Sequence, residues 1–554
     1  MRNTKNIQRR NKGIIISSLA YMLMLMVSCD VDRFPETRIT DPTFWRNESD
    51  LKSATNRLYA YLPKLLEDND VWSNDVWSDD AYGTETNDIS DGTLLVPGSN
   101  RTFNSLYRLV RTANVIIEKS ALVIETGLEA DKANIYVGEA RFFRAWAYFN
   151  LLQRYGGVPL ILNTVASDSP ELYAKQASRE EVLTAIYADL DFSANKLPLP
   201  GEMAGGNYGR ISKTVALAFK SRVALFEGTR AKYHAYGNPE QHLNLAKQAA
   251  LAVINSGQHD LHNSYYELFQ YEGEGSSNPE NILVRIYGKN IADNILSHKS
   301  QRKLEQGKVS PTKALADSYL LTDGLPMSKS PNYNVPSTIM EVFANRDPRM
   351  LHSFLKEGNE YIGTQLEFTI PSLSFQKTGF ANRRYINPED WNTQKSFIDY
   401  PIIRYAEVLL NYAEATFELD GSISDDDLNK SINELRSRPD VMMPSLTNSF
   451  ATINNLDMKA EIRRERRVEL ALEGFRYWDL NRWKTAEIEL PKPVLGNYYF
   501  AEFGTVVTPL LDGNGYILLQ SGADREFDPA KNYLWPFPTE QLALNPSLIQ
   551  NANW

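Results

Sequence analysis

The stretch EARFFRAWAYFNLLQRYGGVP, residues 139–159, carries the strongest helical pattern of the chain. Its apolar face recurs at three- and four-residue spacing and consists of Phe142, Ala145, Phe149 and Leu152. The pattern predicts a helix over about 132–155. Gly156-Gly157 supplies a left-handed cap, and Pro159 prevents the helix from continuing. This long helix with a wide apolar face predicts a helical core.

Further helices flank this one and form pairs. The spacing predicts helices over 178–197, 212–233, 239–255 and 404–419, the first opening with the capping-box pattern Ser178 to Glu181. Small residues recur along the last three of these helices, among them Ala224, Ala246 and Ala415, and they let neighbouring helices approach closely, as in stacked tetratricopeptide hairpins. We expect a mainly α fold: a globular scaffold of tetratricopeptide-like helix pairs with a loop-rich part that contains short β-strands.

The distribution of helical patterns and loop-forming residues along the chain predicts one domain over 46–554. The helical scaffold covers about 46–260 and 400–485, and Gly, Ser, Pro and Asn are frequent in the insertions at about 261–399 and 486–554. Short strands such as 281–287 and 516–520 occur in the insertions. The segment Asp512-Gly-Asn-Gly515 before the second strand predicts a hairpin turn; a calcium loop is the alternative, although its later acidic ligands are missing.

The N-terminus has the sequence features of an export signal. Five basic residues precede the apolar run Ile14–Cys29, which is too short for a comfortable membrane span and ends in the only cysteine of the chain. The ending Met26-Val-Ser-Cys29 resembles the lipobox of bacterial lipoproteins. That resemblance implies a signal peptide over 1–28, acylation of Cys29 and an extended linker over 29–45. The alternative is an ordinary buried cysteine in an uncleaved N-terminus.

Composition narrows the classes of function. The chain has 554 residues and a net charge of −10, without a basic tract, which argues against binding to nucleic acid. No later apolar run is long enough to span a bilayer, so we expect membrane contact through the N-terminal lipid alone. With Cys29 acylated, no disulfide can form, and burial must hold the fold together.

No catalytic or metal-binding pattern stands out. The six histidines are scattered, and the chain lacks HExxH, CxxC, GxSxG and P-loop motifs. Asp79 and Asp80 could form a glycosidase acid and nucleophile, but adjacent acids are more typical of a solvated loop. We therefore predict a protein that is not an enzyme and that holds no metal or cofactor.

The helix at 139–159 resembles the corresponding helix of the SusD/RagB family of outer-membrane lipoproteins in Bacteroidota almost throughout. Further resemblances occur in the family's order at Trp77–Asp80, Leu106–Asn114, Asn345–Arg349, Arg404–Ala415, Glu461–Leu480 and Trp535–Asn551. The arginines and glutamates of the fifth motif also suggest local ion pairs at i,i+4 spacing. The family usually has Ala-Gly where Pro439-Asp440 stands here, which affects one loop.

This resemblance implies a non-catalytic protein, anchored by lipid on the outer face of the outer membrane. Such proteins cap a TonB-dependent (SusC-like) barrel, capture glycans or, in some members, peptides, and deliver them to the barrel. The preferred prediction is oligo- or polysaccharide binding. The alternatives are a peptide-binding lid of the same kind of transporter and a helical adaptor lipoprotein without a small ligand.

The binding residues are expected in loops that combine aromatic rings with polar groups. Rings stack on the apolar faces of sugars, while Asp, Asn and Arg bond their hydroxyls. The predicted ligand-binding residues are Trp72, Trp77, Asp79, Asp80, Tyr82, Arg101 and Trp391.

Overall fold

The structure is a computed structural model and describes residues 44–65, 71–166, 168–203, 207–288, 296–362 and 367–554. The predicted signal peptide, with Cys29 and nearly all of the predicted linker, lies outside the described residues. Among the helices that are described, none is both long and apolar enough to cross a membrane.

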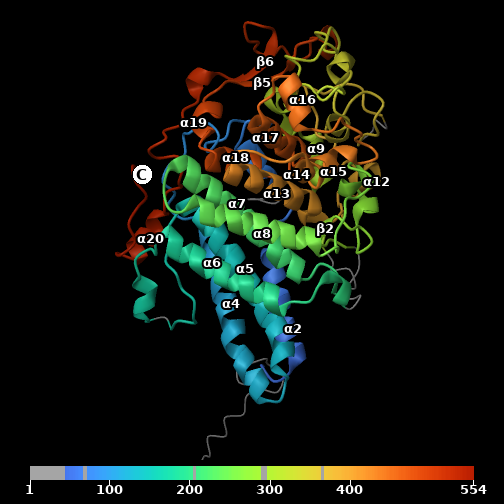
Figure 1. The fold of residues 1–554 in the computed structure, drawn as a ribbon. Helices are drawn as coiled ribbons and strands as arrows, with labels where there is room; N and C mark the ends of the chain where they lie inside the picture. Colours follow the sequence, from blue (N-terminus) through green and yellow to red (C-terminus); the bar gives the residue numbers. More distant parts are fainter. Residues whose placement is uncertain (1–43, 66–70, 167, 204–206, 289–295, 363–366) are drawn as a thin grey trace, which may run out of the picture.

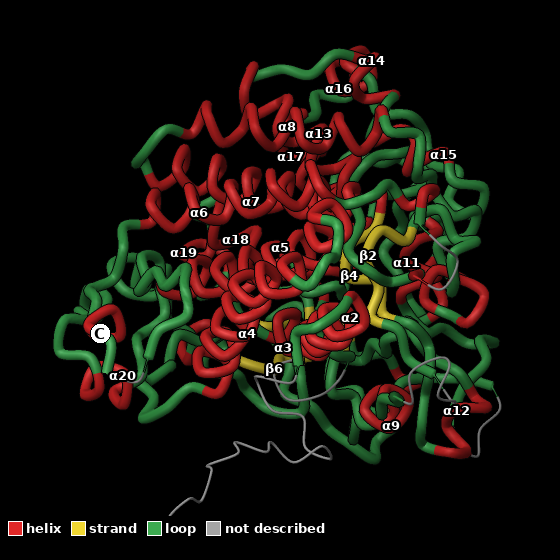
Figure 2. Tube along the Cα trace, turned by 90° about the horizontal axis from the view of Figure 1, so that it is seen from below, coloured by secondary structure: helices red, strands yellow, loops and turns green. Residues whose placement is uncertain are grey.

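Long helices stacked side by side form the scaffold. They are α4 (Arg101–Glu125), α5 (Ala130–Tyr155), α6 (Arg179–Lys196), α7 (Lys213–His234), α8 (Pro239–Asn255) and α13 (Tyr405–Asp420). Helix α4 packs on α5, α5 on α6, α7 on α8, and α13 on both α7 and α8. Figures 1 and 2 show these helices as successive layers. The prediction of a mainly α fold is confirmed.

Shorter helices complete the molecule, many of them in the loop-rich part. They are α2 (Glu48–Asn56), α3 (Val71–Val76), α9 (Ser300–Glu305), α10 (Lys313–Ala316), α11 (Pro348–Ser353), α12 (Pro388–Thr393), α14 (Asp425–Asn429), α15 (Ile432–Ser437), α16 (Asn448–Ile453), α17 (Met458–Glu469), α18 (Arg476–Arg482), α19 (Ala486–Glu489) and α20 (Thr539–Leu544). A 3₁₀ turn, η2 (Arg57–Tyr61), follows α2 directly. In Figure 1 the α2–α4 end lies at the bottom, and the loop-rich part lies at the top.

The predicted helix ends have the expected chemistry. At the start of α6, the Ser178 backbone N–H donates to Glu181 Oε2 at 2.7 Å, and the Glu181 N–H donates to Ser178 Oγ at 3.2 Å. Helix α5 ends at Tyr155, and its cap Gly156 has a φ of 74°, which is strained for a residue with a side chain. The capping box is confirmed; Gly156 ends the helix with a positive φ, but its ψ of −125° lies outside the left-handed helical region, so the predicted left-handed cap is wrong in that detail.

The small residues on the paired helices lie at helix contacts. Ala224 of α7, Ala246 of α8 and Ala415 of α13 are fully buried in one apolar cluster. Their methyl groups let the three helices approach closely, as the tetratricopeptide-like pattern predicts.

Three two-stranded antiparallel sheets occur among the described residues. They pair β1 (Ala81–Tyr82) with β3 (Ser310–Pro311), β2 (Asn281–Arg285) with β4 (Tyr400–Arg404), and β5 (Val494–Tyr498) with β6 (Tyr516–Gln520). Before β6, Asp512 Oδ1 accepts the backbone N–H groups of Asn514 and Tyr516, both at 2.9 Å. Asp512 thus stabilises the predicted turn through its own side chain.

Buried ion pairs join the late helix α17 to distant parts of the chain. Glu469, with no exposed surface, accepts hydrogen bonds from Arg349 at 2.9 Å, Arg404 at 2.7 Å and Arg438 at 3.0 Å. Glu465 likewise pairs with Arg349 and Arg436. The sequence pattern suggested local pairs within α17, and for these two glutamates that was wrong, because both point into the core toward arginines of other elements.

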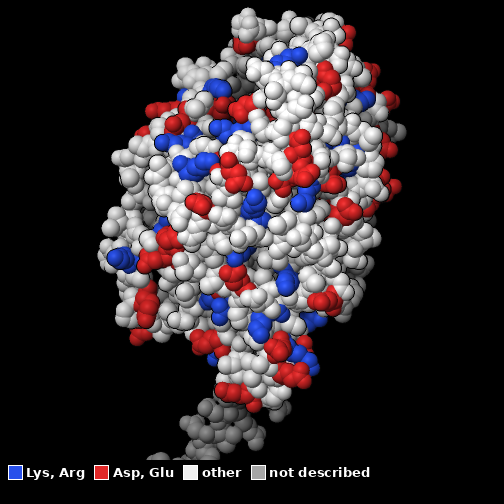
Figure 3. Space-filling model, viewed as in Figure 1, with Lys and Arg blue, Asp and Glu red and all other residues white. Residues whose placement is uncertain are grey.

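The surface of the molecule carries both positive and negative side chains. On the face drawn in Figure 3, basic and acidic side chains intermingle over the helical and loop-rich parts.

Candidate functional site

An open cleft of about 1090 Å³ lies where the helical scaffold meets the loop-rich part. Its walls come from η2, α3, the first turn of α4, the end of α5, the start of α9, the segment after α12 and Trp535. Helices α9 and α12 contact each other and lie near one another in Figure 2. Segments far apart in the sequence therefore share one concave surface of a size that suits an oligomeric ligand.

Four aromatic side chains line the cleft: Tyr61, Trp77, Trp146 and Trp535. Trp77 and Trp146 are nearly buried, whereas Tyr61 and Trp535 are half-buried and remain accessible. The Trp77 and Trp535 rings meet edge to face with 5.2 Å between centroids. The Trp535 indole N–H donates to the Tyr477 hydroxyl at 3.1 Å, which holds the ring in place.

The two long helices place polar groups at the mouth of the cleft. The Asn100 side chain caps α4 by accepting the Phe103 N–H at 2.9 Å, so Arg101 is the first residue of the helix and is exposed. Asn150 and Arg154 come from the last turns of α5. The cleft also contains His298, but burial lowers the pKa of its ring to about 4, so this ring is neutral at pH 7.

Two of the predicted ligand-binding residues, Trp77 and Arg101, lie together in this cleft. Trp77 is 6% exposed and belongs mainly to the core, so its accessible part forms the inner wall. Arg101 projects from the rim. Contact of either residue with a ligand stays a prediction.

Asp79 and Asp80 bind arginines of the same chain. Asp79 bonds Arg476 at 2.8 Å and Arg467 at 3.0 Å, and Asp80 accepts the Arg467 Nε–H at 2.7 Å. Burial alone would raise the pKa of Asp79, but Arg467 and Arg476 outweigh it and hold the pKa well below its usual range. Both carboxylates tie the loop to α18 and the end of α17, and neither lines the cleft. They are therefore not part of this cleft, and their contact with a ligand stays a prediction.

The other predicted residues take different places. Tyr82 lies half-buried on β1, away from the cleft lining. Trp391 lies in α12 and packs partly on the core, while Thr393, Gln394 and Lys395 just after it line the cleft. Trp72 lies in α3, but its side chain is outside the described part of the structure. Their roles as ligand contacts stay predictions.

Sequence reasoning missed several lining residues, among them Tyr61, Trp146, Arg154, Lys299 and Trp535. Trp146 and Trp535 belong to the motifs that were interpreted as structural. The polar and aromatic residues next to each motif were a signal that could have indicated these lining residues. However, no spacing in the sequence shows that residues 61, 146 and 535 lie close together.

Among the described residues, no group of three His, Cys, Asp or Glu side chains is placed to hold a metal ion. The cleft instead combines apolar rings with amide, hydroxyl and cationic groups. That combination can hold a ligand with both apolar faces and polar edges.

Comparison with known families gives two matches. Residues 269–554 match the SusD family, and residues 36–225 match a SusD-like family described as starch-binding and associating with the outer membrane. A SusD-like protein of Formosa agariphila is 27% identical over 511 residues, which cover 88% of this chain and 94% of the relative. A SusD-like protein of Bacteroides ovatus is 24% identical over 586 residues, covering 97% of each chain.

Solved structures of SusD-like proteins also superpose on this chain. A SusD-like carbohydrate-binding protein of Bacteroides fragilis superposes with a TM-score of 0.77 at 27% identity, covering 92% of this chain and 100% of that one. A second SusD-like protein of the same organism, at 21% identity and a TM-score of 0.72, covers 93% and 99% and supports the fold.

Proposed function

Because this chain belongs to the SusD family, we propose that it is a non-catalytic carbohydrate-binding protein of the bacterial outer membrane. An oligo- or polysaccharide binds in the cleft and passes to a TonB-dependent, SusC-like barrel. The diacylglycerol-modified Cys29 anchors the protein on the outer face of the membrane.

The observation that supports this proposal is the pairing of accessible rings with polar groups in one open cleft. Tyr61 and Trp535 are half-buried and line the same space as Asn100, Arg101 and Asn150. A pyranose ring presents an apolar C–H face to an aromatic ring and hydroxyls to amides and guanidiniums. The walls are held by helices α4 and α5, so the cleft exists before the ligand binds.

Binding by the mature full chain tests the proposal. Affinity electrophoresis in gels that contain single polysaccharides identifies a ligand, and calorimetry gives its Kd. Tyr61→Ala should weaken binding about three- to tenfold, the usual contribution of one aromatic contact. Trp535→Ala should weaken it at least as much.

Tyr173→Ala is the matched control, because Tyr173 is 51% exposed on another surface and does not line the cleft. Trp535 also packs on other rings, so its variant is compared with wild type by thermal unfolding first. Tyr61 likewise packs partly on the core, so the Tyr61→Ala variant is checked in the same way. If some polysaccharide binds and both cleft variants bind it as wild type does, the cleft is not the site.

The two alternatives receive less support. The similar solved proteins whose names state a ligand are described as carbohydrate- or glycan-binding, which favours sugars over peptides. A helical adaptor without a small ligand would be favoured by a buried loop over Trp72–Tyr82 and by the absence of an aromatic cleft on the surface. Trp77 is nearly buried, but it forms the wall of an open cleft, so that argument for an adaptor fails.

Delivery to a barrel needs its own test. Detergent extraction of the native membrane, followed by capture of this protein, should recover a TonB-dependent barrel. Recovery of the protein without any barrel after mild extraction and crosslinking counts against the delivery step while leaving glycan binding untouched.

A further inference from the structure

The cleft is cationic, although the protein as a whole is acidic. The chain has 69 Asp and Glu residues against 59 Lys and Arg. Among the described residues that line the cleft, seven are Lys or Arg and none is Asp or Glu. The mixed surface of Figure 3 shows no comparable separation of charge. A concave surface with charges of one sign focuses the field and attracts ligands of the opposite sign.

Four of these cations have no carboxylate partner among the residues that the structure describes. Arg57, Arg101, Lys299 and Lys395 are exposed, and none of them lies within 4.0 Å of a carboxylate among the described residues. They come from η2, α4, the residue before α9 and the segment after α12, so they approach the cleft from different sides. Their charges are therefore available to a ligand.

Arg154 is the deepest cation of the cleft. It is 8% exposed, and its guanidinium lies 5.1 Å from the Trp478 ring centroid and 5.2 Å from that of Trp535. Its Nη1 donates to the Asn150 backbone oxygen at 3.0 Å and to Asn150 Oδ1 at 3.2 Å, and its buried Nε has no acceptor.

The core arginines are arranged differently. Arg349 and Arg404 each bind carboxylates from three acidic residues at 2.9 Å or less. A buried cation without a carboxylate is costly unless something else supplies the negative charge. Burial also lowers the pKa of the Arg154 guanidinium. The missing charge can come from a ligand that enters beside Trp535.

We propose that the ligand of this cleft is an anionic oligosaccharide, one that carries carboxylate or sulfate groups along a sugar chain. The proposal rests on the glycan-binding function proposed above and adds the charge class of the glycan. Tyr61 and Trp535 contact the sugar rings. Arg101, Lys299 and Lys395 pair with the acidic substituents at the rim, and Arg154 meets one of them next to Trp535.

The test compares charged and neutral glycans on the mature full chain. Polygalacturonate and chondroitin sulfate are the anionic probes, with pullulan and xyloglucan as the neutral ones, measured by calorimetry at about 50 and 500 mM NaCl. We expect binding of at least one anionic probe that weakens clearly with salt, because screening shortens the reach of charge pairs. Polygalacturonate carries carboxylates alone, whereas chondroitin sulfate carries both carboxylates and sulfates, so binding of polygalacturonate points to carboxylate recognition.

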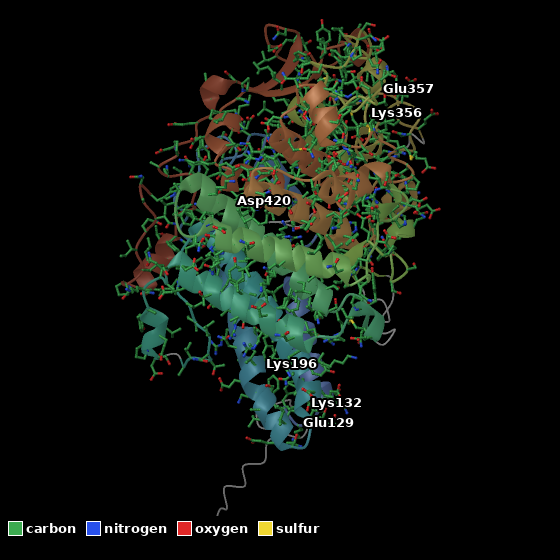
Figure 4. All side chains as sticks on the ribbon, in the orientation of Figure 1. Glu129, Lys132, Lys196, Lys356, Glu357 and Asp420 are labelled. Atoms are coloured by element: carbon green, nitrogen blue, oxygen red, sulfur yellow. The ribbon has the colours of Figure 1, made fainter. Side chains whose placement is uncertain are left out.

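The variant Arg101→Gln/Lys299→Gln/Lys395→Gln removes three exposed positive charges and keeps an unbranched polar side chain at each position. Its affinity for the anionic probe should fall about 5- to 100-fold, from exposed ion pairs of ordinary strength. The control Lys132→Gln/Lys196→Gln/Lys356→Gln removes the same charge from residues outside the cleft, which are labelled in Figure 4. This control should bind as wild type does.

The outcomes separate the two proposals. Tight binding of a neutral glycan that the cleft triple variant leaves unchanged overturns the anionic ligand and supports glycan binding. Equal loss in the cleft and control variants also overturns it, because net charge would then explain the effect. Binding of poly-L-glutamate with no glycan bound at all overturns both proposals.

Discussion

Replacing Glu469 should strongly destabilise this fold, although the substitution to glutamine changes the side-chain shape little. Its carboxylate has no exposed surface and accepts hydrogen bonds from three arginines that come from different parts of the chain. Glu469→Gln keeps the volume but removes the charge and turns an N–H₂ group toward a guanidinium. Breaking a buried ion pair on one side costs about 3–5 kcal/mol of unfolding free energy.

This cost converts into a measurable shift. An unfolding entropy of about 2.1 cal/mol/K per residue gives about 1 kcal/mol/K for roughly 500 residues, so Tm should fall by about 3–5 °C at pH 7. Urea unfolding, followed by tryptophan fluorescence, gives the free energy independently. Glu129→Gln is the control. It breaks the exposed pair with Lys132 at the α4–α5 tip (Figure 4), and exposed pairs contribute about 0–1 kcal/mol.

The sign of the pH dependence of folding stability follows from the direction of the pKa shift of Glu469. Although burial alone raises it, the pKa of Glu469 in the folded protein is held well below the ordinary value of 4.5, because Arg404, Arg438 and Arg349 outweigh burial. The contribution of Glu469 to stability is therefore fully present above pH 4.5 and is lost as the pH falls through the folded pKa. The gap between wild type and Glu469→Gln should narrow on acidification below pH 4.5. A variant as stable as wild type at pH 7, or a gap that widens in acid, would refute the reasoning.

Three further variants test separate parts of the structure. Asp79→Asn loses hydrogen bonds from Arg467 and Arg476, so stability should fall by about 1.5–3 kcal/mol in urea unfolding while glycan affinity is unchanged; lost affinity at full stability would make Asp79 a ligand contact. Trp77→Ala removes a buried ring and should cost about 3–5 kcal/mol by the same assay, and a loss below 1 kcal/mol would show that the site collapses onto neighbouring rings. Cys29→Ala should move the protein to the soluble fraction on cell fractionation; a variant still bound to membrane would place the anchor in the barrel contact.

Local patterns were enough to predict the scaffold. The helix ending at Gly156, the capping box of Ser178 and the small residues at Ala224, Ala246 and Ala415 all lie where sequence spacing placed them. These features depend on residues within one or two helical turns of each other, or on surfaces whose composition is visible along a single helix. For that reason the mainly α fold and its helix pairs could be predicted without tertiary information.

The candidate site could be predicted only in part. Trp77 and Arg101 lie in the cleft, because a loop rich in aromatic and polar residues does form one of its walls. Asp79 and Asp80 do not line it, since Arg467 and Arg476, which bind them, are nearly 400 residues away in the sequence. A carboxylate in a polar loop has the same sequence signature whether it faces solvent or a buried guanidinium.

The sequence by itself determined the helices, their ends and their apolar faces, because backbone propensity and periodicity act over a few residues. The tertiary structure alone decided which charges pair and which stay open. It directs Glu465 and Glu469 into the core toward distant arginines, and it leaves Arg101, Lys299 and Lys395 of the cleft without a carboxylate partner among the described residues. Charge pairing depends on distances of a few ångströms between residues hundreds of positions apart, and no local pattern carries that information.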